Sequence, residues 1–383
     1  MFLLQYVGMM STKENLALAQ LSEVSNKKVA VSFSGGKDSL VVLDLAYRVG
    51  MRKVVFCDTS IEFEETKKFV SYVEDFYGID IDVIRAPTTF FELIKHAGLP
   101  SRIIRWCCDV FKFGPLSNYA LKEDLYGFVT GLRMSESNKR ATYQSSDNNP
   151  LVPVKQINPI LNWTEQDVWE YIKANNLPIN PLYEYFKRIG CWCCPFKSNE
   201  DWRIMKEHFP EKASYFEKVL FDYADRMGIQ DKDEFITRRR WVAWTNPTRK
   251  VSIGVYSPCQ SVREQVDLIF SGQSKNQVDR ILKVLPIITN DYFIIGDKLR
   301  ITVKEIDKMK LNILIEKALN CKACGACTSL CKKGALLVDK ESIFVDFNKC
   351  DKCRDCLRAS KAYLRGACII RNYSPRVASL VKA

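Results

Sequence analysis

The segment Ser34-Gly35-Gly36-Lys37-Asp38-Ser39 constrains the fold of this chain more than any other feature. The apolar run Val29–Phe33 before it is typical of a short buried strand, and Leu40–Ala46 after it is typical of the packed face of a helix. Two glycines at a strand-to-helix turn let the backbone approach an anion, and the helix N-terminus supplies donors together with the lysine and the two serines. The segment therefore predicts a phosphate or pyrophosphate site, against the alternative of a plain connecting turn.

Strand-like and helix-like segments alternate around this turn. A strand is expected at Val54–Asp58, a helix at Thr66–Tyr77, and further strands at Ile79–Arg85 and Gly127–Gly131. This alternation predicts an α/β fold with a doubly wound parallel sheet, in which ligands bind at the carboxyl ends of the strands. Asp58 falls at such an end and is expected to contribute to nucleotide binding.

The length of 383 residues suggests two or three domains. A helix is expected at Trp163–Ile172, with Thr164 as its cap and Asp167 three residues on. The expected organisation is an N-terminal extension at 1–26, a nucleotide-binding domain with an iron–sulfur site at 27–248, a connecting subdomain at 249–318, and a small α+β ferredoxin-like domain at 319–383.

Fifteen cysteines need an explanation other than disulfides. The chain has no run of eighteen apolar residues, and its first ten residues lack the basic flank and cleavage site of a signal peptide, so a cytoplasmic protein without a membrane segment is expected. Disulfides are rare in that compartment. Because His96 and His208 are the only histidines, all-thiolate metal ligation is the natural alternative.

The clearest metal signal lies in the last sixth of the chain. Cys321, Cys324, Cys327 and Cys331 have the spacing that wraps three thiolates around one 4Fe-4S cluster and sends the fourth to another. Cys350, Cys353 and Cys356 repeat the first three intervals, but Ser360 stands at the fourth position and Cys368 follows eight residues later. Two clusters form if Cys368 returns to the second run, which is the favoured interpretation. Otherwise one centre is incomplete or absent.

The formal charge of +12 is concentrated in the same region. From Cys321 onwards there are thirteen lysines and arginines against five acidic residues. Thiolate-bound clusters carry negative charge, so part of this excess is local compensation. A basic surface for an acidic redox partner or for nucleic acid is the other interpretation.

Two further cysteine groups flank the nucleotide-binding pattern. The adjacent pair Cys107-Cys108 cannot easily bridge to itself, but it can place two thiolates on one metal while Cys191 and Cys194 supply two more. The sequence around these groups resembles the phosphoadenylyl-sulfate and adenylyl-sulfate reductases, within the adenine-nucleotide hydrolases that include ATP pyrophosphatases. The resemblance covers about residues 27–200 and rests on Cys107–Leu116, Gly131–Ser137 with Arg140, Trp163–Trp169, Pro181–Tyr183 and Ile189–Cys191.

The resemblance implies a set of site residues. Cys107, Cys108, Cys191 and Cys194 would hold one 4Fe-4S cluster near the sulfate of the substrate. Lys112, Arg133 and Arg140 would neutralise phosphate or sulfate oxygens, arginine being suited to bidentate contacts. The implied activity is the reduction of adenylyl sulfate or phosphoadenylyl sulfate to sulfite and an adenine nucleotide. In this hypothesis the ferredoxin-like domain passes on the electrons of a low-potential donor.

Two departures from the family pattern keep alternatives open. The short Glu-Cys-Gly tail that carries the family's nucleophile is missing, so matching does not name the nucleophile. The unassigned thiols are Cys57, Cys193 and Cys259, of which Cys193 lies next to the expected cluster. The intact Ser34–Ser39 segment suggests that pyrophosphate is still a product. The chain could therefore be an ATP-dependent enzyme that adenylates a tRNA base or DNA backbone for sulfur insertion. A non-enzymatic electron-transfer subunit with a relic nucleotide domain is a third alternative.

Overall fold

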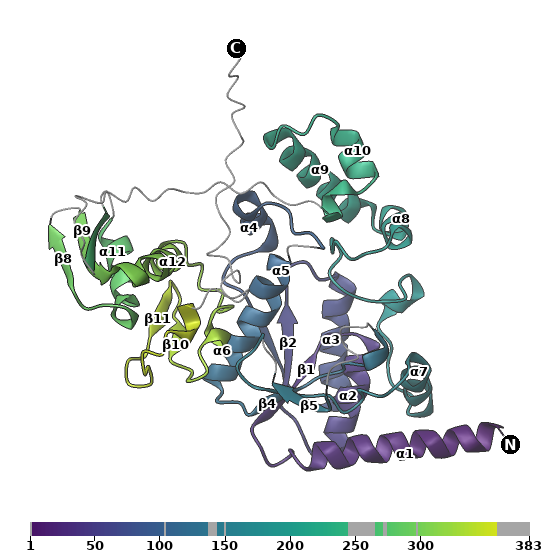
Figure 1. Ribbon diagram of the computed structural model, residues 1–383. Coiled ribbons are helices and arrows are strands. Elements are labelled where there is room, and N and C mark those ends of the chain that lie inside the picture. Colours follow the sequence, from purple (N-terminus) through teal and green to yellow (C-terminus); the bar gives the residue numbers. More distant parts are fainter. Residues whose placement is uncertain are drawn as a thin grey trace. The chain divides into compact units, whose positions relative to one another are not determined.

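The computed structural model describes residues 2–102, 105–136, 144–148, 151–243, 265–270, 274–295 and 298–357 (Figure 1). The chain forms two compact units. Unit 1 contains Met1–Arg85 and Tyr119–Ser214, and unit 2 contains Ala86–Asn118 and Tyr215–Ala383. Residues 86–118 thus group with the C-terminal half of the chain, a division that differs from the sequence-based boundaries, which stay a prediction.

Unit 1 is built on a six-stranded sheet with the order β3-β2-β1-β4-β6-β5. All neighbouring strands are parallel except β5, which pairs antiparallel with β6. This confirms the predicted α/β fold with a parallel sheet. The strands are β1 (Val29–Phe33), β2 (Val54–Asp58), β3 (Ile81–Arg85), β4 (Gly127–Val129), β5 (Ser146–Asn148) and β6 (Lys155–Ile157).

Three helices of unit 1, α2, α3 and α7, lie where the apolar patterns predicted them. The helix after β1 has its apolar residues buried in the same core as the strands. Thr164 and Asp167 form the expected reciprocal capping box, in which each side chain accepts from the other's backbone N–H. The helices are α1 (Phe2–Ser22), α2 (Lys37–Arg48), α3 (Glu64–Tyr77), α7 (Glu165–Ala174), α8 (Asn199–His208) and the start of α9 (Pro210–Arg226).

The order of the strands reverses at β1, which has β2 on one side and β4 on the other. In open α/β sheets the ligand crevice lies outside the carboxyl ends of the strands at this switch point. The segments that leave these two ends pack closely, because a Cβ at Gly131 would lie 2.6 Å from the carbonyl carbon of Asp38. Only glycine fits there. The chain thus brings residues 34–39 and 131–133 together.

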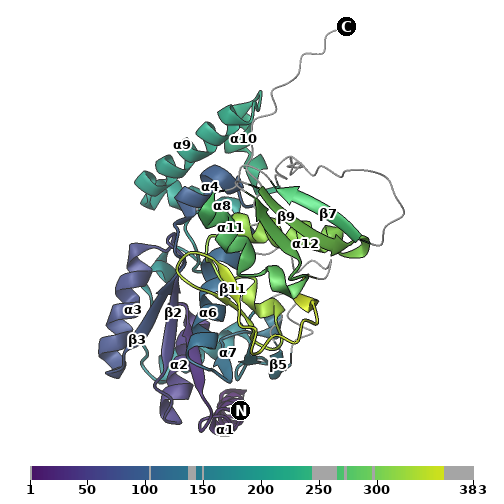
Figure 2. The same cartoon turned by 90° about the vertical axis from the view of Figure 1, so that its left-hand side faces the viewer.

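Unit 2 begins with α4 (Phe90–Ala97) and α5 (Trp106–Cys108), which continues through a π-helical turn at Asp109–Phe113 into α6 (Gly114–Lys122). A three-stranded antiparallel sheet of order β7-β9-β8 lies further along the chain, followed by the hairpin β10–β11 (Figure 2). The remaining elements are α10 (Lys232–Thr237), β7 (Gln265–Phe270), α11 (Lys275–Leu282), β8 (Tyr292–Ile295), β9 (Lys298–Lys304), α12 (Lys308–Leu319), β10 (Leu336–Val338) and β11 (Ile343–Val345).

The two sheets of unit 2 share one hydrophobic core. Apolar residues from Leu268 to Ala318 pack in it together with Cys321, Cys327 and residues of the β10–β11 hairpin. The sequence did not predict a structure for the connecting segment 249–318. Its described part is α+β and packs directly against the C-terminal cysteine region.

The thirteen cysteines of the described residues are all free thiols. None of the helices in this part of the chain is both long and apolar enough to cross a membrane.

Candidate active site

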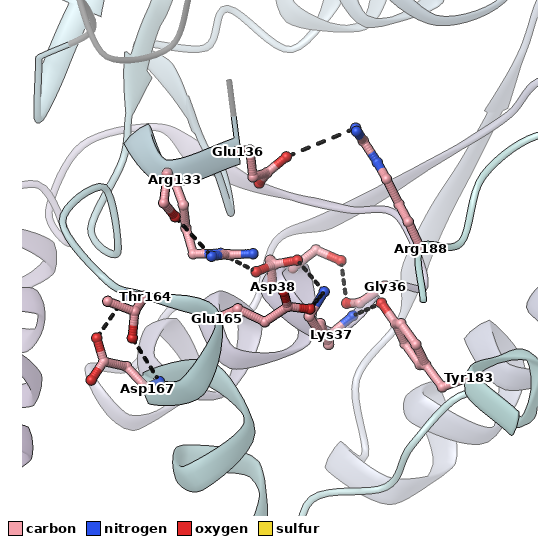
Figure 3. Close-up of polar contacts among 12 residues, drawn as sticks. Gly36, Lys37, Asp38, Arg133, Glu136, Thr164, Glu165, Asp167, Tyr183 and Arg188 are labelled. Carbon is pink, nitrogen blue, oxygen red and sulfur yellow. Dashed lines mark hydrogen bonds and ion pairs between the residues drawn. The ribbon is translucent and has the colours of Figure 1, made fainter. Parts of the chain in front are cut away.

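The loop between β1 and α2 has the geometry of an anion site (Figure 3). Gly35 has a φ of +72°, and a Cβ there would lie 2.7 Å from Cγ2 of Thr66, so both conformation and space require glycine. Gly36 caps α2 without a side-chain hydrogen bond to the first turn. Ser39 holds the loop closed, because its Oγ accepts from Ser34 N at 3.1 Å and donates to Gly36 O at 2.8 Å.

Lys37 is the first residue of α2 and is only 6% exposed. Its backbone N–H donates to the phenol oxygen of Tyr183 at 2.8 Å. Its Nζ lies 3.3 Å from a carboxylate oxygen of Glu165 and 3.5 Å from one of Asp38. Burial raises the pKa of Tyr183, so the phenol stays neutral. An anion entering the loop would compete with this phenol oxygen for the Lys37 amide.

Arg133 is the second buried cation of the site, at 4% exposure. It follows β4, and its Nε donates to Oδ1 of Asp38 at 2.5 Å while a terminal nitrogen donates to Oγ of Ser135 at 3.0 Å. Lys37 and Arg133 therefore meet on the same carboxylate (Figure 3). Two cations at a helix N-terminus give this end of the sheet the electrostatics of a site for a multiply charged anion.

Asp58 ends β2, as its position in the sequence suggested, and its side chain is buried. Its two carboxylate oxygens accept from Arg85 Nε at 2.9 Å and from the backbone N–H of Ser60 at 2.9 Å. Ser60 has a φ of +63°. Asp58 thus stabilises the turn after β2, which is an indirect contribution to the site.

The turn that contains Cys191 is anchored to the same turn after β2. The backbone N–H of Trp192 donates to Ile61 O at 3.1 Å. The Cys191 Sγ lies 3.5 Å from Oγ1 of Thr59 and donates to Glu62 Oε1 at 3.8 Å. Within unit 1, Cys191 therefore lies at the edge of the sheet where the strands end.

Cys193 lies in this turn but is only 1% exposed. Burial raises the pKa of its thiol well above the usual value, and the neighbouring Cys194 adds to the effect. A protonated, enclosed thiol is a poor nucleophile. The environment of Cys193 therefore does not favour the role of nucleophile, for which the sequence made it a candidate.

Lys197 is a buried cation in the same turn that sequence reasoning missed. Its Nζ lies 3.9 Å from the ring centroid of Phe186, and its backbone N–H donates to Cys194 O at 3.1 Å. Burial lowers its pKa, against the opposing effect of Asp201 and of the cysteines at 191, 193 and 194. Its position three residues after Cys194 was the available signal. Its charge can offset that of thiolates in the turn.

In unit 2, Cys107 and Cys108 end a short helix and precede the π-helical turn, a feature frequent at functional sites. A hydrogen bond from Cys107 and the charge and hydrogen bond of Arg105 lower the pKa of Cys108 to about 6, against the effect of burial. Lys112, which is exposed, contributes to the same shift. Cys108 is therefore a thiolate at neutral pH, the form that binds metals.

The two C-terminal cysteine runs share a backbone conformation. Ala323 and Gly325 have positive φ in the first run, and Lys352 and Arg354 have positive φ at the same offsets in the second, 29 positions later. Alternation of right- and left-handed residues turns successive N–H groups into one concavity, which binds anions and iron–sulfur clusters. Three of these four residues are not glycine, and such conformations persist only where the surroundings enforce them.

Individual thiols in these runs also have the environment of cluster ligands. The Sγ of Cys321 accepts from the N–H groups of Ala323 and Ile343, and that of Cys331 accepts from Ala335. Burial raises the pKa of Cys356 to about 12, and the charges of Cys331, Cys350 and Cys353 add to the effect.

Thiol chemistry and backbone thus fit iron–sulfur ligation. Nevertheless, among the residues that the structure describes, no three cysteine, histidine or acidic side chains are gathered closely enough to hold a metal ion. Arg140 and Cys368, both predicted site residues, lie outside the described residues. The predicted ligands Cys107 and Cys108 belong to unit 2, and Cys191 and Cys194 to unit 1. This four-cysteine set stays a prediction.

Comparison with known proteins identifies a family for part of the chain. Residues 28–197 match the phosphoadenosine phosphosulfate reductase domain. An adenosine 5′-phosphosulfate reductase of Staphylococcus haemolyticus is 31% identical over 186 residues, which are 46% of this chain and 74% of that protein. A phosphoadenylyl-sulfate reductase structure from Candida auris is similar with a TM-score of 0.40 and 21% identity, over 48% of this chain and 89% of that one.

Other relatives are longer than the matched region. An uncharacterised protein of Methanocaldococcus jannaschii is 41% identical over 215 residues, which are 54% of this chain and 44% of that protein. A second uncharacterised protein of the same organism is 34% identical, with 52% of its length covered. The chain thus spans about half the length of these two relatives.

Proposed function

Because the chain belongs through residues 28–197 to the phosphoadenosine phosphosulfate reductase family, we propose that it reduces adenylyl sulfate or its 3′-phosphorylated form to sulfite and an adenine nucleotide. The observation that supports this most is the meeting of Lys37 and Arg133 at the N-terminus of α2. A phosphosulfate group carries charges on both the phosphate and the sulfate. Two buried cations at a helix N-terminus suit such a group.

In this proposal the loop and its neighbours bind and orient the substrate. The phosphate of the nucleotide accepts from the Lys37 amide in place of the Tyr183 phenol, which now lies 2.8 Å from that nitrogen. Arg133 exchanges Asp38 for phosphate or sulfate oxygens, to which a guanidinium can bind in bidentate fashion. Lys112 and Arg140 are proposed to neutralise further oxygens.

The reaction consumes two electrons and no proton. The bond between sulfur and the bridging oxygen breaks, the oxygen leaves with the nucleotide phosphate, and the two electrons remain on sulfur as sulfite. Cys107, Cys108, Cys191 and Cys194 would hold one 4Fe-4S cluster, and the C-terminal runs one or two more. When bound, such clusters supply one-electron redox chemistry. The co-reactant is a low-potential one-electron donor, used twice.

The proposal is tested with anaerobically reconstituted protein, each of the two nucleotides and reduced viologen as donor. We expect sulfite and the adenine nucleotide in equal amounts. Replacing Arg133 by Ala should lower kcat/KM by on the order of 100-fold, because a buried charge-assisted contact is lost. Arg188→Ala is the matched control, since Arg188 is 76% exposed and lies 3.8 Å from Glu136. Absence of sulfite with both nucleotides would contradict the proposal.

A second candidate function rests on the intact loop between β1 and α2. An enzyme that adenylates a tRNA base or DNA backbone for sulfur insertion would use the same anion site for the β- and γ-phosphates of ATP. The C-terminal excess of basic residues suits a nucleic-acid partner. Release of pyrophosphate from ATP, stimulated by tRNA or DNA, would support this function over the first.

A further inference from the structure

Strand β8 is an edge strand of the antiparallel sheet β7-β9-β8 and exposes apolar side chains on both of its faces (Figure 1). Its four residues, Tyr292, Phe293, Ile294 and Ile295, are between 36% and 68% exposed. Among the strands that the structure describes, only β9 pairs with β8. Single exposed apolar residues are ordinary, but a row of them along an open sheet edge indicates a surface for another chain.

One face of β8 continues the hydrophobic core of unit 2 to the edge of the sheet. Tyr292 pairs with Ile301 of β9, and Ile294 pairs with Leu299. The two β9 residues are fully buried in the core that also contains apolar residues of α11 and α12. At β8 this apolar layer reaches solvent, so a further strand beside β8 would cover it.

The hydrogen bonds to β9 determine which backbone groups of β8 face the open edge. The backbone N–H of Thr302 donates to the carbonyl oxygen of Asp291 at 2.9 Å. Hydrogen-bonded and non-hydrogen-bonded pairs alternate along an antiparallel ladder, so the odd-numbered residues of β8 bond to β9. The N–H and C=O groups of Tyr292 and Ile294 therefore point away from β9, towards the open edge.

The composition of β8 suits pairing with a copy of itself. Two copies of one edge strand bring the same residues together, so a charge on the strand would meet a like charge on the other copy. Natural edge strands use such charges, prolines and bulges to prevent this pairing. β8 contains neither a charged residue nor a proline, and its register with β9 runs without a bulge.

We propose that β8 pairs antiparallel with β8 of a second copy of this chain, so that the two sheets become one continuous sheet across a twofold axis. The groups at the open edge determine the register. Tyr292 of each copy bonds to Ile294 of the other, and the axis passes between the two Phe293 residues. These two residues then form a non-hydrogen-bonded pair, in which side chains come closest and aromatic pairs stabilise a sheet.

The charges that flank β8 are complementary in this register. Asp291 precedes β8, Lys298 begins β9, and both are exposed. The pairing places Asp291 of one copy opposite Ile295 of the other, and Ile295 pairs with Lys298 on its own sheet. The carboxylate and the ammonium group thus lie in one row on one face, with backbones two strand spacings or roughly 10 Å apart. This charge complementarity favours a second copy as the occupant of the edge.

Sedimentation equilibrium of the full-length protein under reducing conditions, between about 1 and 100 µM, tests this pairing. We expect a reversible dimer, in which hydrogen exchange at the amides of Tyr292 and Ile294 slows as the protein concentration rises. Ile294→Lys should raise the dimer dissociation constant at least roughly 100-fold, because apolar side chains leave the interface and two like charges become diagonal neighbours. Ile306→Lys is the matched control and should change nothing, since Ile306 is 80% exposed in the same unit but lies after β9.

A charge exchange separates self-pairing from binding of an unrelated partner. Asp291→Lys and Lys298→Glu should each raise the dimer dissociation constant by about threefold to tenfold, because each places like charges in one row. The double variant should restore the wild-type constant, since the exchanged charges attract each other again across the twofold axis. Both residues are exposed, so the thermal unfolding temperature should stay the same in all three variants.

The inference is overturned if the wild-type protein stays monomeric at the highest of these concentrations, or if Ile294→Lys leaves a dimer intact. A monomer that binds single-stranded RNA and loses this binding in Phe293→Ala would assign the surface to a nucleic acid, and would overturn the inference as well. None of these measurements involves sulfite production, so the pairing of β8 and the proposed reductase function are tested separately.

Discussion

At the scale of single residues, Asp38 helps to set the net charge of the loop between β1 and α2. It pairs with both Lys37 and Arg133, and Glu165 also pairs with Lys37, so two carboxylates balance the two cations in the site without substrate. A bound anion would release these two cations from the carboxylate and use them itself. Such an exchange costs less than exposing buried charges without partners, because each cation always has an opposite charge nearby.

A variant of Cys193 tests whether this thiol is the nucleophile that the family's missing tail would otherwise supply. We expect Cys193→Ser to retain sulfite production within about threefold, because burial raises the pKa of this thiol and a protonated, enclosed thiol is a poor nucleophile. Turnover and the visible absorbance of the reconstituted protein would be measured together. Lost turnover with intact absorbance would instead establish that the turn opens and that Cys193 is the nucleophile, as its place beside Cys194 suggested.

Cys108 should show a distinct pH dependence in metal-free protein. Its pKa of about 6 is below that of an ordinary thiol, so the reactive thiolate persists as the pH falls from 8 to 7 and is lost only through pH 6. We expect iodoacetamide to modify Cys108 with a half-maximal rate near that pH, followed by mass spectrometry. Arg105→Ala removes a charge and a hydrogen bond to the thiolate and should move the midpoint upward. An unchanged midpoint would contradict this cause.

At the scale of elements, the β1–α2 turn depends on the glycine conformation. Gly35→Ala should cost about 1–2 kcal/mol from the positive φ alone, and more from the overlap with Thr66. We expect lower thermal stability and at least tenfold weaker nucleotide binding by calorimetry.

The control for Gly35 lies at the other end of the same helix. Gly50 has a φ of +86° and nothing within 4 Å of a built Cβ, so Gly50→Ala carries the conformational cost without touching the loop. It should lower stability but leave nucleotide affinity unchanged. An equal loss of nucleotide affinity in both variants would show that the loss follows from lower stability of the fold and not from a change in the loop.

At the scale of the whole molecule, the cysteine runs and the basic charge belong together. The C-terminal sixth of the chain carries most of the net charge of +12, and thiolate clusters would offset part of it. Anaerobically purified protein should be brown and contain roughly eight or twelve iron atoms per chain, for two or three cubes. Iron quantitation measures this directly.

A variant links that iron to the C-terminal runs. Cys350→Ser should remove roughly four iron atoms per chain while nucleotide binding persists, because each cube needs its full thiolate set. Cys57→Ser is the control, since Cys57 lies on β2 outside every run. An unchanged iron content in Cys350→Ser, or zinc bound in place of iron, would contradict the assignment of Cys350 as a ligand of an iron–sulfur cluster.

Much of unit 1 could be predicted from local pattern. The strands at Val29–Phe33 and Val54–Asp58 have the expected bounds, and the Thr164–Asp167 box forms as its spacing indicated. The alternation of apolar and polar residues and the capping of helices both depend on residues a few positions apart, so a single sequence is enough to predict them. The carboxyl-end position of residues 34–39 followed from the same patterns.

Burial and close approach were decided by the tertiary structure. Cys193 is buried, the Tyr183 phenol accepts from the Lys37 amide, and the backbone at Gly131 packs against Asp38, although none of these contacts leaves a local signal. By itself, the sequence determined the elements, the anion turn and the cysteine spacing, because these depend on neighbours along the chain. Which side chains lose water and which backbones touch depends on segments tens to hundreds of residues apart, and only the folded chain brings those together.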